Sequence, residues 1–243
     1  MDKVALQNVV SCWGKYDVLA PLEGGHRNAA FRVSGANGEC VLKSTRRNEA
    51  AMNWLVDIHS IARDCGIVVP VLLKGQNGCF VQKGWTLEIF INGVHPDALP
   101  TDWLQSVMAR FHSATRNVGQ RPTFVSTNDL LHLRTGGDVD LDLMPADLVQ
   151  ALRKAWRAVS SSPQSVVHGN INVSNIVAIP NGDFAILDWD ESRFDFSFCD
   201  IAQFSIESAN AKALRAVQAY EIACSWQVEP EYAKQQAEAF LAE

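Results

Sequence analysis

The stretch that decides the fold is His168-Gly169-Asn170-Ile171-Asn172-Val173-Ser174-Asn175, and Asp188-Trp189-Asp190 follows it along the chain. Between them, two short apolar runs flank an Asn-Gly turn, a pattern typical of a β-hairpin over 176–187. A hairpin places the residues before its first strand beside those after its second. We therefore expect Asn175 and Asp188 to lie close together at one end of the hairpin.

Two interpretations of this polar pair are open. Asn175 and Asp188 would offer an amide and a carboxylate oxygen. Such hard oxygen donors suit Mg²⁺, which takes few protein ligands and binds substrate phosphates as well. Alternatively, they are two polar residues that flank a surface turn. The pair alone does not decide between the two.

Outward from this block, the spacing of apolar residues divides the chain into two parts. Before Asn92, a helix is predicted over 48–63, and strand-like runs form two hairpins and a further strand, at 30–33 with 40–42, 71–73 with 79–81, and 86–91. After Gly93, apolar residues recur at helical spacing in the stretches 104–111, 148–159, 214–222 and 230–241. The sequence predicts an α+β protein with a small β-rich N-lobe, residues 1–91, and a larger, mainly helical C-lobe, residues 92–243.

The composition is that of an ordinary folded protein. Of 243 residues, 47% are hydrophobic, which excludes a disordered chain. With 21 Lys and Arg against 27 Asp and Glu, the net charge is −6, which disfavours binding to nucleic acid. No apolar run approaches the ~18 residues of a membrane span, and the N-terminus does not resemble a secretion signal. The six cysteines are scattered without metal or redox spacing. We expect a cytoplasmic protein without nucleic-acid or membrane partners.

Three features of the N-lobe are compatible with phosphate binding. Lys43 ends a strand, Glu49 lies in the first turn of the following helix, and Gly24-Gly25 precedes the first hairpin. Each also has an ordinary explanation: a solvated lysine, a glutamate favoured by the helix dipole, and a simple turn. In the functional interpretation, Lys43 pairs with Glu49 and points its ammonium group at phosphates.

In chain order, these parts follow the protein-kinase design, in which the catalytic-loop residue precedes a metal-binding Asn by five positions. The sequence resembles the aminoglycoside phosphotransferase and choline kinase family, the small-molecule branch of the protein-kinase-like fold. The resemblance spans residues 20–225 and rests on Lys43, Glu49 and the segments 111–114, 168–175, 188–190 and 199–202.

The resemblance implies a bilobal protein-kinase-like fold and an O-phosphotransferase that uses ATP or GTP with Mg²⁺. Lys43 would hold the nucleotide phosphates, Glu49 would orient Lys43, and Asn175 with Asp188 would bind Mg²⁺. Asp200 would brace the catalytic loop. Gly25 would lie in the loop over the phosphates. Glu88 and Phe90 would lie in the hinge that hydrogen-bonds the base. His168 and Asn170 would lie in the catalytic loop.

Asn170 departs from the family pattern, which has Asp at this position. A carboxylate accepts the proton of the substrate hydroxyl, and a neutral amide does not, so general-base assistance of ~10²–10⁴ in rate is lost. We expect this chain to bind nucleotide and to transfer phosphate slowly or not measurably. Either Asn170 is an engineered change in an active parent enzyme, or the chain is a natural pseudokinase that binds nucleotide and regulates a partner.

The expected acceptor is a small molecule. Acidic C-lobe residues would suit an amine-bearing antibiotic or metabolite through charge-assisted hydrogen bonds, and an antibiotic acceptor would imply resistance. The candidates are Asp138, Asp140, Asp142, Asp147, Asp190, Glu191 and Asp195. The alternative is a solvated acidic loop. A protein acceptor is disfavoured, because the segment from Asp190 to Asp200 is too short for a long activation segment.

Overall fold

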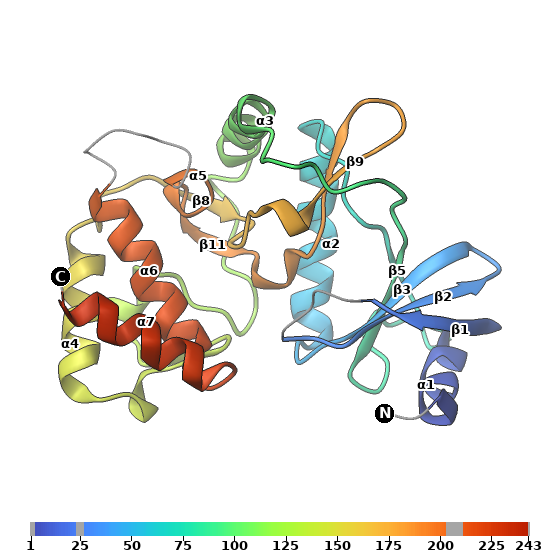
Figure 1. Cartoon of the computed structure of the whole chain (residues 1–243), viewed down its shortest axis with the longest axis horizontal. Coiled ribbons are helices and arrows are strands. Elements are labelled where there is room, and N and C mark those ends of the chain that lie inside the picture. The colour runs from blue at the N-terminus through green and yellow to red at the C-terminus, as the bar shows by residue number, and fades with distance from the viewer. Residues whose placement is uncertain (1–2, 23–26, 203–210, 243) are drawn as a thin grey trace. The chain divides into compact units, whose positions relative to one another are not determined.

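The computed structural model describes residues 3–22, 27–202 and 211–242 (Figure 1). Its contacts divide the chain into an N-terminal unit, residues 1–99 with 172–188, and a C-terminal unit, residues 100–171 with 189–243. The sequence placed one boundary between residues 91 and 92. The structure moves that boundary to Leu99 and Pro100 and adds the segment 172–188 to the N-terminal unit.

The N-terminal unit is built on a five-stranded antiparallel sheet. Its strands in spatial order are β1 (Tyr16–Pro21), β2 (Ala30–Gly35), β3 (Gly38–Ser44), β5 (Trp85–Ile89) and β4 (Leu72–Leu73). The predicted β2–β3 hairpin is confirmed, with Gly35 opposite Gly38 at the turn. Helix α1 (Lys3–Val10) packs Leu6 and Val10 against the apolar face of this sheet and leads into the 3₁₀ turn η1 (Ser11–Trp13).

Helix α2 (Glu49–Asp64) confirms the helix predicted in this unit. Asn48 caps its first turn by accepting the N–H of Ala51, as short polar side chains do at helix starts. Leu55, Ile58 and Ala62 are buried on one face. The helix ends at Asp64, and Gly66 shortly after it has a φ of 84°, a left-handed conformation that glycine adopts without steric cost.

The hairpin predicted for 71–73 with 79–81 is wrong in its second strand. The chain does turn at 75–79, but β4 pairs with β5, with Leu72 opposite Glu88. The N–H groups of Phe80 and Val81 donate to the carboxylate of Glu49. A side chain therefore takes the hydrogen bonds that a strand partner would have taken, which the local pattern could not show.

The segment 172–188 joins the N-terminal unit through its hairpin, β9 (Ile176–Ala178) and β10 (Phe184–Ile186). Ile186 N–H donates to Val68 O at 2.9 Å, and Ala178 forms a bridge with Val94. Ile176 and Ile186 are fully buried. The two apolar runs that predicted the hairpin therefore supply its buried side chains.

The C-terminal unit is mainly helical, as predicted (Figure 1). Trp156, Ile222 and Phe240 are buried in its core. Pro230 begins the last helix, a position that proline favours because its ring fixes a helical φ. Its helices are α3 (Thr101–Ala114), α4 (Ala146–Arg157), α5 (Phe198–Ile201), α6 (Ala211–Ser225) and α7 (Pro230–Ala242).

Short strands and 3₁₀ turns connect these helices. Strands β8 (Gln164–Val167) and β11 (Arg193–Phe196) are antiparallel, as are β6 (Thr135–Gly136) and β7 (Val139–Asp140). The 3₁₀ turns of this unit are η2 (Asp129–Leu131), η3 (Leu141–Leu143) and η5 (Trp189–Glu191), while η4 (Val173–Asn175) lies in the N-terminal unit. Strand β8 comes directly before the stretch 168–175, and strand β11 comes shortly after Asp188-Trp189-Asp190.

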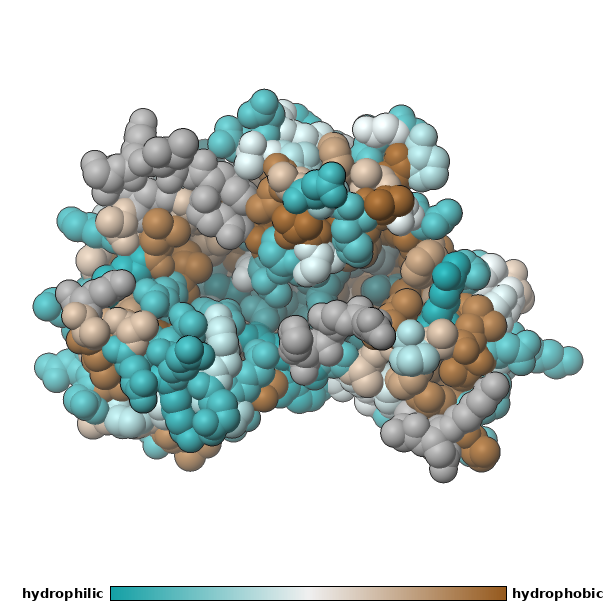
Figure 2. Space-filling view, in the orientation of Figure 1, coloured by the Kyte–Doolittle hydropathy of each residue, from teal (hydrophilic) through white to brown (hydrophobic). Residues whose placement is uncertain are grey.

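Hydrophobic residues on the face drawn in Figure 2 lie in separate groups among hydrophilic ones. Among the helices of the described residues, none combines the length and the apolar character needed to cross a membrane. No disulfide joins the six cysteines, all of which lie within the described ranges.

Candidate active site

Asn175 and Asp188 lie at the same end of the β9–β10 hairpin, as predicted. Leu187 N–H donates to Asn175 O at 2.8 Å, which closes the hairpin one pair beyond its strands. Asn172 Oδ1 accepts Asn175 N–H at 3.2 Å, and this contact holds the η4 turn. Asn175 is 8% exposed. The predicted magnesium role of the pair is compatible with this placement and stays a prediction.

The backbone of Asp188 is in the left-handed region, with a φ of 55°. Asp is one of the few residues other than Gly that adopts this region with some frequency, at a cost of about 1–2 kcal/mol. Such a conformation persists where the surroundings fix it, and here the closed hairpin precedes it directly. The left-handed backbone thus occurs at the residue predicted to bind metal.

Lys43 meets Asp188 directly. Its Nζ forms an ion pair with Asp188 Oδ1, although 145 residues separate the two in sequence. The lysine side chain is 17% exposed and the aspartate side chain 39% exposed. The end of β3 therefore presents a cation beside a carboxylate that remains accessible to solvent. Residue-by-residue inspection treated these two residues separately and missed their contact.

Glu49 is held at the start of α2 by backbone groups. Its Oε1 accepts Phe80 N–H at 3.0 Å and its Oε2 accepts Val81 N–H at 2.9 Å. Both carboxylate oxygens thus tie the 80–81 segment to the helix. The ion pair between Lys43 and Glu49 that the resemblance implies stays a prediction.

The predicted hinge lies at the end of β5. Glu88 pairs with Val41 and Leu72 in the sheet. Phe90 N–H donates to Glu39 O at 3.0 Å, and the Arg32 guanidinium lies 4.5 Å from the centre of the Phe90 ring. The Phe90 N–H is therefore already engaged, so a base at this hinge would use other backbone groups. Gly25, predicted to cover phosphates, lies outside the described residues.

In the C-terminal unit, Asp200 braces the loop that follows β8, as expected. Its Oδ2 accepts His168 N–H at 2.9 Å and its Oδ1 accepts Gly169 N–H at 2.8 Å. His112 Nε2 lies 3.0 Å from Oδ2. The carboxylate is fully buried, so these partners replace the water that it has lost.

The pKa of the Asp200 carboxyl reflects this competition. Burial by itself raises the pKa, because it disfavours the charged form. The hydrogen bond and charge of His112, the charge of His168 and the Gly169 N–H outweigh burial and lower the pKa below its ordinary value. Asp200 is therefore a permanent buried anion at neutral pH, and it holds the loop in place.

His168 and Asn170 complete this loop. His168 is fully buried, and its ring meets the edge of Trp189 with 4.8 Å between centroids. Asn170 N–H donates to His168 Nδ1 at 3.2 Å. This contact gives His168 a part in shaping the loop before position 170. A direct catalytic part for either residue stays a prediction.

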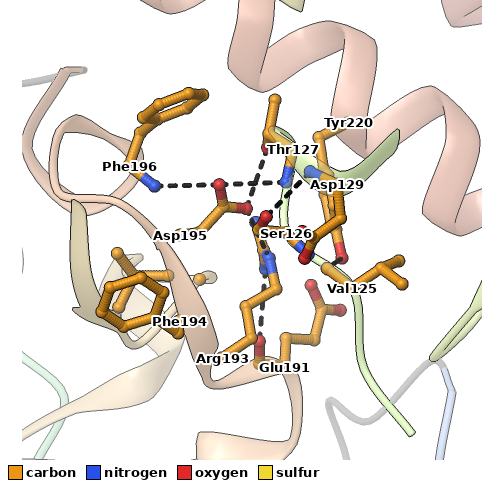
Figure 3. A network of polar contacts seen from close by, with 12 residues as sticks. Val125, Ser126, Thr127, Asp129, Glu191, Arg193, Phe194, Asp195, Phe196 and Tyr220 are labelled. Carbon is orange, nitrogen blue, oxygen red and sulfur yellow. Dashed lines mark hydrogen bonds and ion pairs between the residues drawn. The ribbon is translucent and has the colours of Figure 1, made fainter. Parts of the chain in front are cut away.

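The acidic residues predicted to line an acceptor pocket divide into different settings. Asp142 is exposed and forms an ion pair with Arg134. Asp190 is half-buried, and Glu191 is 9% exposed. Asp195 is fully buried in the polar network of Figure 3, which corrects its assignment to a pocket wall. An acceptor role for Asp142, Asp190 and Glu191 stays a prediction.

Two buried arginines were missed by sequence reasoning. Arg121 donates through Nη1 to the carbonyls of Asp190 at 2.8 Å and Ser192 at 3.1 Å. Arg193 pairs with Asp195 at 2.8 Å. The pairing of Arg193 with Asp195 could have been predicted, because residues two apart on a strand project to the same face. The contacts of Arg121 could not, because its partners are backbone carbonyls far along the chain.

The donors in the N-terminal unit fit a magnesium ion. Asn175 and Asp188 lie at the same end of the β9–β10 hairpin and would supply an amide and a carboxylate oxygen, and the Asp188 side chain is accessible. Within residues 3–22, 27–202 and 211–242, no group of three or more His, Cys, Asp or Glu side chains is placed to hold a metal. A site here would therefore use few protein ligands, which is compatible with the way Mg²⁺ shares its coordination with phosphates.

Comparison with known proteins identifies the fold and the family. Residues 18–238 match the model of a family described as the phosphotransferase enzyme family. None of the curated proteins matches the sequence.

Three solved structures with similar folds are named as kinases or phosphotransferases of small molecules. Choline kinase LicA from Streptococcus pneumoniae has a TM-score of 0.68 at 11% identity, over 99% of this chain and 97% of that one. A microcompartment-associated aminopropanol kinase has a TM-score of 0.62 at 14% identity, over 99% and 94%. Aminoglycoside phosphotransferase APH(4)-Ia, in a ternary complex with ADP and hygromycin B, has a TM-score of 0.63 at 17% identity, over 97% of each. At these identities the likeness establishes the kinase-like fold that the sequence predicts.

Proposed function

Because the chain belongs to the phosphotransferase enzyme family, we propose that it is an ATP- or GTP-dependent O-phosphotransferase acting on a hydroxyl of a small molecule. The observation that carries the proposal is the meeting of Lys43 with Asp188 beside Asn175. A cation, a carboxylate and an amide oxygen from distant parts of the sequence form the set that a magnesium–nucleotide complex requires.

Each of these residues has a definite task. The Lys43 ammonium group attracts the nucleotide phosphates as a point charge. Asn175 and Asp188 would hold Mg²⁺, which supplies neutralisation of the phosphate charge when bound. The accessible Asp188 carboxylate is able to exchange its lysine partner for a metal ion at modest cost, because a partly exposed ion pair is weak.

Asn170 sets the limit on the chemistry. The amide at this position can orient a hydroxyl by a hydrogen bond, but it cannot take the proton. The rest of the loop is intact, since Asp200 holds the amides on its N-terminal side. We therefore infer a chain that binds nucleotide and transfers phosphate slowly, derived from an active enzyme with Asp at this position.

The acceptor is proposed to carry an amino group. The acidic balance of the chain and the placement of Asp190 and Glu191 after Asp188 support a cationic acceptor. The similar structures are named for amine compounds: choline, aminopropanol and aminoglycosides. If the acceptor is an antibiotic, its phosphorylation would confer resistance. The competing function, nucleotide binding that regulates a partner, is favoured by Asn170 alone.

The test compares this chain with Asn170→Asp and with a control, Asn117→Asp, which adds the same charge at an exposed position. Transfer from ATP and from GTP with Mg²⁺ is measured against choline, aminopropanol, homoserine, sugars and a panel of aminoglycosides. Asn170→Asp should raise turnover of one acceptor by at least about 10²-fold, and the control should not.

Two other results would count against the proposal. Nucleotide binding by all three chains without turnover by Asn170→Asp would favour the regulatory function. Failure of all three to bind nucleotide would overturn the proposal as a whole.

A further inference from the structure

Gly169, the residue before position 170, is packed against a buried guanidinium group. Its φ is 87°, and a Cβ added there would lie 2.8 Å from Arg193 Nη1 and 2.9 Å from Glu191 O. Its N–H is held by Asp200. Gly169 is therefore fixed by a hydrogen bond through its nitrogen and by close packing against Arg193 at its Cα.

Arg193 is itself held on several sides. Its Nε donates to Asp195 Oδ2 at 2.8 Å and its Nη1 to Glu191 O at 3.2 Å (Figure 3). Its guanidinium carbon lies 3.6 Å from the centre of the Tyr220 ring. The arginine side chain is 3% exposed and the Asp195 side chain 0%. A planar group with this many fixed contacts has little freedom to move.

The carboxylate that holds Arg193 is equally constrained. Asp195 Oδ1 accepts the N–H groups of Thr127 at 3.0 Å and Phe196 at 2.8 Å, and Oδ2 accepts the Thr127 hydroxyl at 2.8 Å (Figure 3). With Arg193, four donors satisfy one buried carboxylate. Such a fully satisfied network is rigid, and it holds Arg193 in place against the loop at 168–170.

We propose that Arg193 is a positioning residue for position 170: the guanidinium group, locked by Asp195 and Tyr220, supports Gly169 and so fixes where the side chain at 170 points. This inference rests on the proposed phosphotransferase function, in which position 170 meets the acceptor hydroxyl. Arg193 acts through Gly169 and touches no reacting atom.

The charge of Arg193 is permanent. Burial by itself would lower its pKa, but the neighbouring Tyr220 and Asp195 outweigh burial and raise the pKa well above its ordinary value. Arg193 therefore does not act as a proton donor or as a pH switch. Its contribution is rigid support, together with the positive potential of a cation close to Gly169, the residue before position 170.

The experiment uses the full chain carrying Asn170→Asp, into which Arg193→Lys, Arg193→Met and the double change Arg193→Met with Asp195→Asn are introduced. The double variant removes both buried charges and so guards against misfolding from an unpaired carboxylate. Arg153→Met is the matched control, because Arg153 also donates to backbone carbonyls in the same unit, at Leu130 and Leu133. The measurements are kcat, the KM for nucleotide, the pH profile of kcat and amide hydrogen exchange over 168–171.

The proposal predicts a fall in kcat of about 10- to 100-fold for Arg193→Met and for the double variant, with the KM for nucleotide unchanged. Arg193→Lys should recover part of the loss. In Arg193→Met the acid limb of the pH profile, which reports the carboxyl introduced at 170, should move to higher pH, because loss of a nearby cation raises a carboxyl pKa. The shift should be smaller in the double variant, which loses the Asp195 charge as well. The control should change none of these.

Amide exchange separates this inference from the proposed function. If the Asn170→Asp chain shows no turnover, the phosphotransferase proposal fails, yet faster exchange over 168–171 in the Arg193 variants would still support the loop-positioning role. If the folded Arg193 variants keep kcat, the pH profile and the exchange rates, the positioning proposal is overturned.

Discussion

Each of the two units contains an ion pair between a basic side chain and an aspartate, and the two pairs differ in burial. Lys43 with Asp188 joins the end of β3 to the end of a hairpin, and its side chains are 17% and 39% exposed. Arg193 with Asp195 lies on the single strand β11, and its side chains are 3% and 0% exposed. The first pair keeps water and ligands within reach, whereas the second has only protein partners.

The difference teaches how burial assigns a role to a charge. A partly exposed pair contributes little to stability and is free to be exchanged for a ligand. A buried pair is locked, because either charge left alone would have to be desolvated without compensation. Lys43 and Asp188 are thus suited to binding, and Arg193 and Asp195 to holding the frame beneath the loop.

The largest expected effect comes from breaking the buried pair. Asp195→Asn leaves Arg193 buried without its counter-charge, so the free energy of unfolding should fall by about 3–5 kcal/mol. Asp188→Asn, its isosteric counterpart in the exposed pair, should cost about 0–1 kcal/mol. Urea unfolding followed by circular dichroism measures both. Equal losses for the two variants would contradict the assignment of roles by burial.

The next effect is on ligand binding and should fall on the other pair. Lys43→Met and Asp188→Asn should weaken binding of a non-hydrolysable ATP analogue with Mg²⁺ by about 10- to 100-fold, the worth of a charge-assisted contact. Isothermal titration calorimetry is the measurement. Asp183→Asn, on the exposed turn of the same hairpin, is the control and should leave binding intact. The loss of affinity caused by Asp188→Asn should be smaller when EDTA removes Mg²⁺. If the loss is the same with and without Mg²⁺, the metal role of Asp188 is excluded.

Alanine substitutions at two glycines test how tightly Arg193 packs against Gly169. Gly169 and Gly182 have φ values of 87° and 90°, but a Cβ at Gly182 would meet nothing within 4 Å. Gly182→Ala should therefore cost only the conformational strain of about 1–2 kcal/mol. Gly169→Ala should cost about 1–3 kcal/mol more, because it presses on Arg193 and Glu191. Thermal unfolding of both variants gives the comparison, and equal costs would mean that Arg193 yields easily.

The smallest effect belongs to a third, exposed pair, Arg134 with Asp142. Asp142→Asn should change the free energy of unfolding by less than about 1 kcal/mol. If Asp142 contributes to acceptor binding, the affinity for the amine-bearing acceptor found in the transfer assay should fall modestly, and the decrease of that affinity with added salt should become less steep. Calorimetric titration at low and high salt checks this. An affinity independent of both salt and the substitution would remove Asp142 from the acceptor site.

Local patterns in the sequence identified much of the frame. The Asn-Gly turn between apolar runs predicted the β9–β10 hairpin, and its geometry predicted that Asn175 and Asp188 would meet. Helical spacing located α2, α3, α4, α6 and α7. These predictions succeeded because turn chemistry and periodic burial act over a few residues.

Contacts between distant segments were beyond such patterns. The 79–81 stretch has the composition of a strand, yet the Glu49 carboxylate takes the N–H groups of Phe80 and Val81. The partners of Arg121 are backbone carbonyls, which every residue has, so no sequence spacing marks them. The pairing of charges across 145 residues likewise depends on how the sheet and the hairpin meet.

The sequence by itself determined the order of the parts: the strand lysine, the helix glutamate, the loop 168–175 and the aspartates that follow it, and with them the family and the departure at Asn170. Only the tertiary structure decided which charges are buried. That difference has a physical reason, since a side chain's identity is local, whereas its desolvation depends on every segment packed around it. Asp188 and Asp195 are the same residue type in the sequence, and their surroundings make one a candidate ligand and the other part of the frame.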